Sequence, residues 1–203
     1  SAAVVFLHGF TESSAIWQDF ARKLMPAYRV VLIDLPGHGR SGCLSDIHDM
    51  SLMAGVVASV LDYLKIDKCA LIGHSMGGYV ALAFARLHPR RLSGLGLFHS
   101  TALADSEEAR RNRDRAIEII RQNHHGFLSG FIPSLFAPDN RKSLSKEIGE
   151  LVADARNMTA RGVIAAQQGM KLRQDNTAVL SELRVPVCFI AGHLDERIPL
   201  EGL

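Results

Sequence analysis

The segment Lys68–His88 reads KCALIGHSMGGYVALAFARLH and predicts a strand, a sharp turn and a helix in succession. Residues 69–72 form a short apolar run, which is typical of a strand buried on both faces of a parallel sheet. Beyond the bend, apolar residues recur at helical spacing until Pro89 ends the helix. Ser75 stands at the bend, within the Gly-x-Ser-x-Gly pattern of residues 73–77. A strained turn needs small neighbours if its serine is to project into a cleft, so this context predicts a nucleophilic serine.

Composition places the chain among ordinary globular proteins. It has 203 residues, 47% of them apolar and 22% charged, which predicts one large domain or a domain with an insertion. A net charge of +2 does not indicate a polyanionic partner. The three cysteines lack metal-ligand spacing, so we expect free thiols and a cytoplasmic location.

No apolar run approaches the roughly 20 residues of a membrane span, and no signal peptide is visible. Because a buried strand is expected to begin within the first residues, a targeting segment could lie upstream of Ser1.

Strands and helices alternate along most of the chain, which predicts a mostly parallel sheet with helices on both faces. Ser13 or Ser14 can cap the first helix, and Asp49 can cap the second. Besides the strand before Ser75, the expected strands are residues 3–7, 29–34, 92–98 and 185–192.

Between two of these strands the pattern becomes purely helical, from Asp105 to about Gln174. We expect a charged helix over residues 106–125, a second helix around Ile148, and a third capped by Thr159. A helical insertion of this kind predicts a lid over the carboxyl edge of the sheet. The expected division is a core of residues 1–101 and 180–203, with a helical lid (cap) of residues 102–179.

Four motifs occur in order: HGF at residues 8–10, DLPGHGRS at 34–41, GHSMGG at 73–78 and AGHLDERIP at 191–199. Together they resemble the α/β-hydrolase family of the single-chain, lidded kind. The resemblance implies a sheet with more strands than this chain provides. We therefore expect the chain to be truncated at both ends, without the family's first two strands and its last strand and helix.

The resemblance implies a nucleophile, an acid and a histidine, in that order along the chain. Ser75 and Asp195 fill the first two positions. Glu196 is the neighbouring candidate for the acid. The alternative role for Asp195 is a purely structural one, a surface ion pair with Arg197. We expect the histidine beyond Leu203 and nominate none of the nine within the chain. His74 should point away from the cleft if Ser75 points into it.

The resemblance also assigns an oxyanion hole, the pair of donors that stabilises the tetrahedral intermediate, to the backbone N–H groups of Phe10 and Met76. Gly9 would let the first loop approach closely, and His8 would either hold that loop or cap the strand. The supporting positions are His8, Gly9, His74 and Gly77.

Phe127, Phe131 and Phe136 belong to an aromatic patch of the insertion that either lines an acyl pocket or attaches the cap to the sheet. The arginines of the first insertion helix alternate with acidic residues, which favours a solvated helix face over a nucleic-acid site. These arginines are Arg110, Arg111, Arg113 and Arg115.

These features predict a serine hydrolase acting on a small, largely apolar ester, with no metal, organic cofactor, nucleic-acid partner or membrane partner. Thioesterases, lactonases, lipases and carbon–carbon bond hydrolases share the same apparatus. A serine at the bend between the strand and the helix argues against dehalogenases and epoxide hydrolases, which the resemblance leads us to expect with aspartate there. Tyr79 stands where look-alikes of the menaquinone-synthesis lyase usually carry arginine. A ligand sensor with slow or single turnover, or an inactive scaffold, would belong to other functional classes.

Overall fold

A five-stranded parallel sheet forms the centre of the computed structural model, which describes residues 2–195, 197 and 198. Within these residues the strand order is β2-β1-β3-β4-β5, and every neighbouring pair is parallel. The strands are β1 (Ala3–Leu7), β2 (Arg29–Ile33), β3 (Cys69–His74), β4 (Leu92–Phe98) and β5 (Val187–Ile190). The predicted parallel sheet is confirmed.

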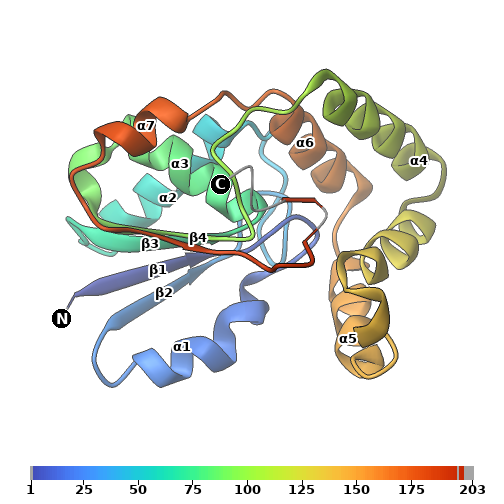
Figure 1. The fold of residues 1–203 in the computed structure, drawn as a ribbon, viewed down its shortest axis with the longest axis horizontal. Helices are drawn as coiled ribbons and strands as arrows, with labels where there is room; N and C mark the ends of the chain where they lie inside the picture. Colours follow the sequence, from blue (N-terminus) through green and yellow to red (C-terminus); the bar gives the residue numbers. More distant parts are fainter. Residues whose placement is uncertain (1, 196, 199–203) are drawn as a thin grey trace.

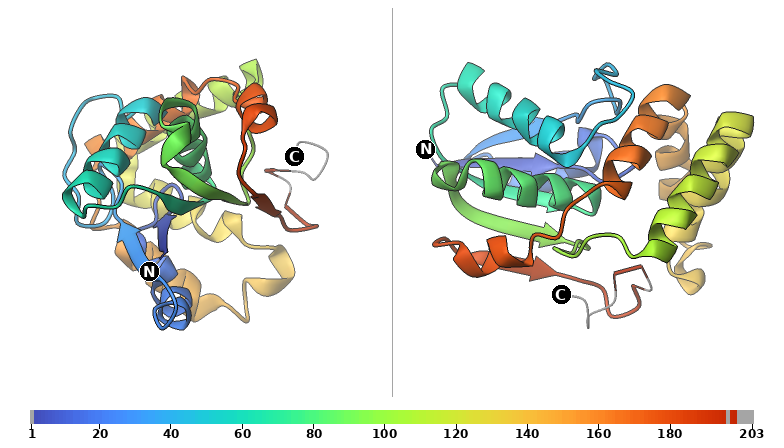
Figure 2. Two further views of the ribbon diagram at one scale, coloured as in Figure 1. Left: turned by 90° about the vertical axis from the view of Figure 1, so that its left-hand side faces the viewer. Right: turned by 90° about the horizontal axis from the view of Figure 1, so that it is seen from above.

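Helices cover both faces of this sheet, as predicted (Figure 1 and Figure 2). The 3-10 helix η1 (Ser14–Trp17) and α1 (Gln18–Leu24) lie on one face, where Phe6 and Trp17 are buried together. On the other face α2 (Met50–Tyr63) and α3 (Met76–Leu87) bury a larger apolar cluster against the strands.

Side-chain caps at the first residues of η1 and α2 help to explain why these segments are helical. The hydroxyl of Ser13, rather than that of Ser14, accepts the Ala15 N–H at 3.3 Å, and Asp49 Oδ1 accepts the Leu52 N–H at 2.8 Å. Each cap satisfies a donor that the first turn of a helix leaves unpaired.

Four helices and short 3-10 turns are inserted between β4 and β5. They are α4 (Glu107–Phe131), η3 (Pro133–Leu135), η4 (Pro138–Asn140), α5 (Ser145–Ala155), α6 (Ala160–Lys171) and α7 (Thr177–Glu182). In Figure 1, α4, α5 and α6 lie beyond the carboxyl ends of the strands, whereas α7 returns to contact α3. The expected boundary after residue 179 therefore falls within α7.

The first insertion helix extends further than predicted. The chain breaks its helical conformation at Asn123, close to the expected end at His125, but the helix resumes and ends at Phe131. Asn123 Oδ1 accepts the Gly126 N–H at 2.8 Å and so restarts the helix in the manner of an N-cap. As a result, Phe127 and Phe131 lie on the last turns of α4.

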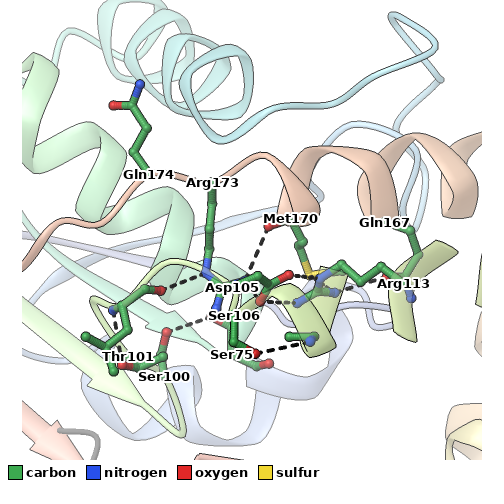
Figure 3. Close-up of polar contacts among 12 residues, drawn as sticks. Ser75, Ser100, Thr101, Asp105, Ser106, Arg113, Gln167, Met170, Arg173 and Gln174 are labelled. Carbon is green, nitrogen blue, oxygen red and sulfur yellow. Dashed lines mark hydrogen bonds and ion pairs between the residues drawn. The ribbon is translucent and has the colours of Figure 1, made fainter. Parts of the chain in front are cut away.

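The two ends of the α4–α6 unit meet at Asp105, just before α4. Its carboxylate accepts hydrogen bonds from Arg113 of α4 and from Arg173, which follows α6 (Figure 3). The Arg173 guanidinium also lies over the Tyr79 ring of α3, 4.1 Å from the ring centroid. Arg113 therefore does not belong to the solvated helix face predicted for it. Its side chain is 18% exposed because its partners lie in the interior.

All three cysteines are free thiols, as expected. None of the described helices is long and apolar enough to cross a membrane.

Candidate active site

Ser75 occupies a strained turn between β3 and α3. Its φ of 48° and ψ of −113° lie outside the regions that residues with a side chain prefer, a conformation that costs about 1–3 kcal/mol. Hydrogen bonds of the Ser75 backbone hold this turn. The Ser75 N–H donates to the Phe98 carbonyl at 2.8 Å. The Ser75 carbonyl accepts from the N–H groups of Gly78 and Tyr79, at 2.9 and 3.3 Å, and from Ser100 Oγ at 2.8 Å (Figure 3). The neighbouring strand β4 thus helps to impose the conformation of Ser75.

The glycines beside Ser75 are needed for space. A Cβ atom on Gly77 would lie 2.6 Å from the carbonyl oxygens of both Leu7 and His8, and one on Gly73 would lie 2.3 Å from the Gly77 backbone. The first turn of α3 therefore packs directly on the end of β1, which places Ser75 beside the loop that follows β1.

A cavity of about 330 Å³ opens at Ser75. Its polar lining consists of Thr11, Glu12, His74, Ser75, His99, Asp195 and Arg197, and its apolar lining consists of Phe10, Phe131, Ile132, Leu135, Phe136, Leu151 and Ile198. A larger open hollow of about 660 Å³, between α4 and α6, contains none of the predicted site residues.

The aromatic patch divides between the two alternatives considered for it. Phe131 and Phe136 line the cavity. Phe127 does not, contrary to expectation: its ring stacks on Phe131, with the centroids 5.2 Å apart, and packs against the core clusters. Phe127 lies one turn before Phe131 on α4, so the two rings are neighbours on one side of the helix.

His74 lies in the cavity wall, so the expectation that it points away from the cleft is wrong. Its Nδ1 atom is 2.8 Å from Glu12 Oε2, and the same oxygen accepts the Gly9 N–H at 2.6 Å. Burial alone would lower the pKa of His74, but the charge and hydrogen bond of Glu12 outweigh burial and raise it. Burial would raise the pKa of Glu12, and His74 together with the Gly9 N–H holds it below its ordinary value. The sequence drew no attention to Glu12.

Asp195 follows β5 and contacts a histidine that the sequence did not nominate. Its Oδ2 atom is 2.7 Å from Nδ1 of His99, which follows β4, and both side chains line the cavity. The clue available in the sequence was the position of His99, directly after the strand predicted over residues 92–98.

The other oxygen of Asp195 accepts the backbone N–H groups of Arg197 and Ile198, at 2.9 and 3.1 Å. The Arg197 guanidinium instead donates to Ser134 Oγ at 3.0 Å, so the ion pair considered as the alternative role of Asp195 is not seen. Burial would raise the pKa of Asp195, but the His99 bond and these N–H groups lower it. Glu196 lies outside the described residues.

His8 fixes the loop that carries Phe10. Its Nε2 atom accepts the Leu35 N–H at 2.9 Å, so the ring proton is on Nδ1, which donates to the Gly9 carbonyl at 2.8 Å. Burial lowers the pKa of His8, consistent with a neutral ring. The ring therefore bonds the loop itself. Met76, the other expected donor, begins α3, where backbone N–H groups have no acceptor within the helix.

Comparison with known proteins identifies the family of the chain. A family model described as the alpha/beta hydrolase fold matches residues 2–160. Over 209 residues the chain is 33% identical to a Bacillus subtilis (strain 168) protein provisionally named 2-succinyl-6-hydroxy-2,4-cyclohexadiene-1-carboxylate synthase, with 97% of this chain and 75% of that protein covered. A 2-hydroxy-6-oxononadienedioate/2-hydroxy-6-oxononatrienedioate hydrolase of Burkholderia vietnamiensis (strain G4) is 29% identical, with 98% of this chain and 73% of its own length covered.

Solved structures agree with the family match. A thermophilic esterase from Thermogutta terrifontis has a TM-score of 0.93 and 34% identity, and the match covers 100% of this chain and 75% of that chain. The enol-lactonase from Burkholderia xenovorans LB400 has a TM-score of 0.89 at 20% identity, covering 100% and 76% of the two chains, which is evidence for the fold alone. The chain therefore belongs to the α/β-hydrolase-fold family.

Proposed function

We propose that the protein is a serine hydrolase that cleaves a small, largely apolar ester through an acyl-enzyme on Ser75. The observation that carries the proposal is the strained serine between β3 and α3, which lines a cavity together with the carboxylate of Asp195. A conformation that costs free energy persists where the surrounding structure imposes it, and such residues cluster at active sites.

In the proposed reaction, Ser75 Oγ attacks the ester carbonyl carbon and transfers its proton to a histidine base. The backbone N–H groups of Phe10 and Met76 would bind the oxyanion that forms. Collapse of the tetrahedral intermediate expels the alcohol, which takes the proton from the base. Water, deprotonated by the same base, then attacks the acyl carbonyl carbon. The carboxylic acid leaves as the bond to Ser75 breaks, and Ser75 Oγ takes the proton back from the base.

Asp195 is the proposed acid that orients this base and stabilises its protonated form. Its lowered pKa keeps it ionised near neutral pH. The family order places the base after Asp195, and we propose that it follows Leu203. An ionised carboxylate has about four lone-pair sites, so His99 and the base can bind Asp195 together.

The insertion is the proposed cap, and its side chains supply most of the apolar lining around Ser75. A volume of about 330 Å³ is at the lower end of ligand cavities, which favours a small substrate. The thermophilic esterase, at 34% identity, supports an ester. Thioesters, lactones and carbon–carbon bonds, the alternatives that the family resemblance implies, belong in a substrate panel beside esters. Two relatives are likewise named for reactions other than ester cleavage.

The test uses full-length protein with p-nitrophenyl butyrate and a fluorophosphonate probe. We expect steady turnover, one covalent adduct on Ser75 by mass spectrometry, and loss of both in Ser75→Ala. Ser59→Ala, on the exposed face of α2, is the matched control and should behave like the wild type. An intact protein that gains no adduct on Ser75 removes the nucleophile. Release of a single equivalent of p-nitrophenol, followed by arrest, would instead support a sensor with single turnover.

A further inference from the structure

Glu12 joins the two loops that carry the proposed catalytic groups. One carboxylate oxygen accepts both the Gly9 N–H, at 2.6 Å, and His74 Nδ1, at 2.8 Å. Gly9 precedes the proposed donor Phe10, and His74 precedes the proposed nucleophile Ser75. Glu12 and His74 are only 12% and 27% exposed, so water competes weakly for these bonds.

These contacts determine how the Phe10 N–H is directed. The Gly9 N–H is held by Glu12, while the Gly9 carbonyl accepts His8 Nδ1 at 2.8 Å and the Glu12 N–H at 3.3 Å. The Gly9 carbonyl and the Phe10 N–H belong to one planar trans peptide and point in opposite directions. Holding Gly9 at both ends therefore fixes the direction of the Phe10 N–H.

The space around Gly9 is a second, independent indication that Glu12 and His74 hold this loop. A Cβ atom at position 9 would lie 2.7 Å from Glu12 Oε2 and 2.9 Å from His74 Nδ1. Gly9 does not adopt a positive φ, so its backbone conformation does not itself require glycine. The absence of a side chain at position 9 is explained by the room that the Glu12–His74 pair occupies.

The charges are balanced within the pair. An uncompensated carboxylate beside the cavity would oppose the negative charge that develops on a substrate oxygen. The raised pKa of His74 and the lowered pKa of Glu12 favour an imidazolium–carboxylate pair, which brings no net charge. A neutral glutamine at position 12 could also accept the Gly9 N–H, because its amide oxygen is an acceptor.

We propose that Glu12, held by His74, is a positioning residue that sets the direction of the Phe10 N–H relative to Ser75. This inference rests on the proposed function, because it takes Phe10 as an oxyanion donor. A donor that acts mainly in the transition state changes kcat more than KM.

The kinetic test compares Glu12→Ala and Glu12→Gln in full-length protein with p-nitrophenyl butyrate. Loss of an oxyanion donor lowers kcat by about 10²–10³-fold, so a misdirected donor in Glu12→Ala should lower kcat by about 10- to 100-fold, with KM within about twofold. The glutamine oxygen still accepts the Gly9 N–H, so Glu12→Gln should recover most of kcat. Glu147→Ala, on the exposed face of α5, is the control and should leave both constants unchanged.

A second measurement does not depend on turnover. Amide hydrogen exchange at Gly9, whose N–H donates to the Glu12 carboxylate, should accelerate at least tenfold in Glu12→Ala and return toward the wild-type rate in Glu12→Gln. Wild-type exchange in Glu12→Ala, or equal kcat in an active wild type and Glu12→Ala, would overturn the positioning role. An inactive wild type whose Ser75 resists the fluorophosphonate would instead overturn the proposed function, while the exchange data would still decide whether Glu12 holds the loop.

Discussion

Replacing Asp105 by alanine should destabilise the protein far more than replacing an exposed acid on the same helical unit. Asp105 is 3% exposed and is the shared acceptor of Arg113 and Arg173, which are 18% and 7% exposed. Its removal leaves the Arg173 guanidinium buried with the carbonyls of Leu103 and Met170 but without this counter-charge. The wild-type protein and Asp105→Ala therefore differ in a buried charge rather than in packing alone.

The magnitude follows from this geometry. Breaking a buried ion pair by removing one partner costs about 3–5 kcal/mol. Arg113 can turn toward water and Arg173 keeps its carbonyls and the Tyr79 ring, so we expect the lower end, about 3 kcal/mol. For a chain of this size each kcal/mol shifts Tm by about 2–4 °C, which gives a decrease of about 6–12 °C.

The assay is urea unfolding followed by circular dichroism, together with a thermal melt, for the wild type and two variants. Asp114→Ala is the matched control, because Asp114 pairs with Lys171 at 2.6 Å but is 52% exposed. An exposed pair contributes about 0–1 kcal/mol. If Asp105→Ala costs no more than Asp114→Ala, with unchanged m-values, the reasoning about the buried ion pairs of Asp105 with Arg113 and Arg173 is wrong.

The ion pairs of Asp105 with Arg113 and Arg173 also predict how the stability depends on pH. Burial would raise the pKa of Asp105, but the hydrogen bonds and charges of Arg113 and Arg173 lower it. The stability that Asp105 adds is therefore complete above its unfolded pKa of about 4 and is lost as the pH falls through the lower folded value. The difference in unfolding free energy between the wild type and Asp105→Asn should shrink from pH 7 to pH 3. A difference that grows toward low pH would contradict this sign.

Two further substitutions test the site. Gly77→Ala should destabilise the protein by about 1–3 kcal/mol in urea unfolding, because its Cβ would meet two backbone carbonyls. Gly55→Ala in α2 is the control: its Cβ would meet nothing within 4 Å, so the change should stabilise by about 0.5–1 kcal/mol. Equal effects of the two substitutions would refute the packing argument. His99→Gln should lower kcat for p-nitrophenyl butyrate by about tenfold through the loss of its 2.7 Å bond to Asp195, whereas a loss near 10⁴-fold would identify His99 as the base.

Local patterns were sufficient for the framework of the fold. Apolar runs and helical periodicity predicted the strands and most helices, because those patterns reflect burial along a few consecutive residues. The position of Ser75 followed from the same local information: glycines flank a serine between a strand and a helix. Helix caps such as Asp49 and Thr159 could also be predicted, since a capping side chain bonds a neighbour two or three residues away.

The contacts that organise the site depended on tertiary structure. Glu12 and His74 are 62 positions apart, and His99 and Asp195 are 96 positions apart. Parallel strands bring their carboxyl ends to one edge of the sheet, so loops distant in sequence meet there, but the partner chosen by each side chain depends on the conformation of every loop. The sequence by itself thus determined the parallel sheet, the inserted helices and the place of Ser75. Only the tertiary structure decided that His74 faces the cavity, that Phe127 does not, and that Asp195 meets His99, because these contacts arise between segments that no local pattern relates.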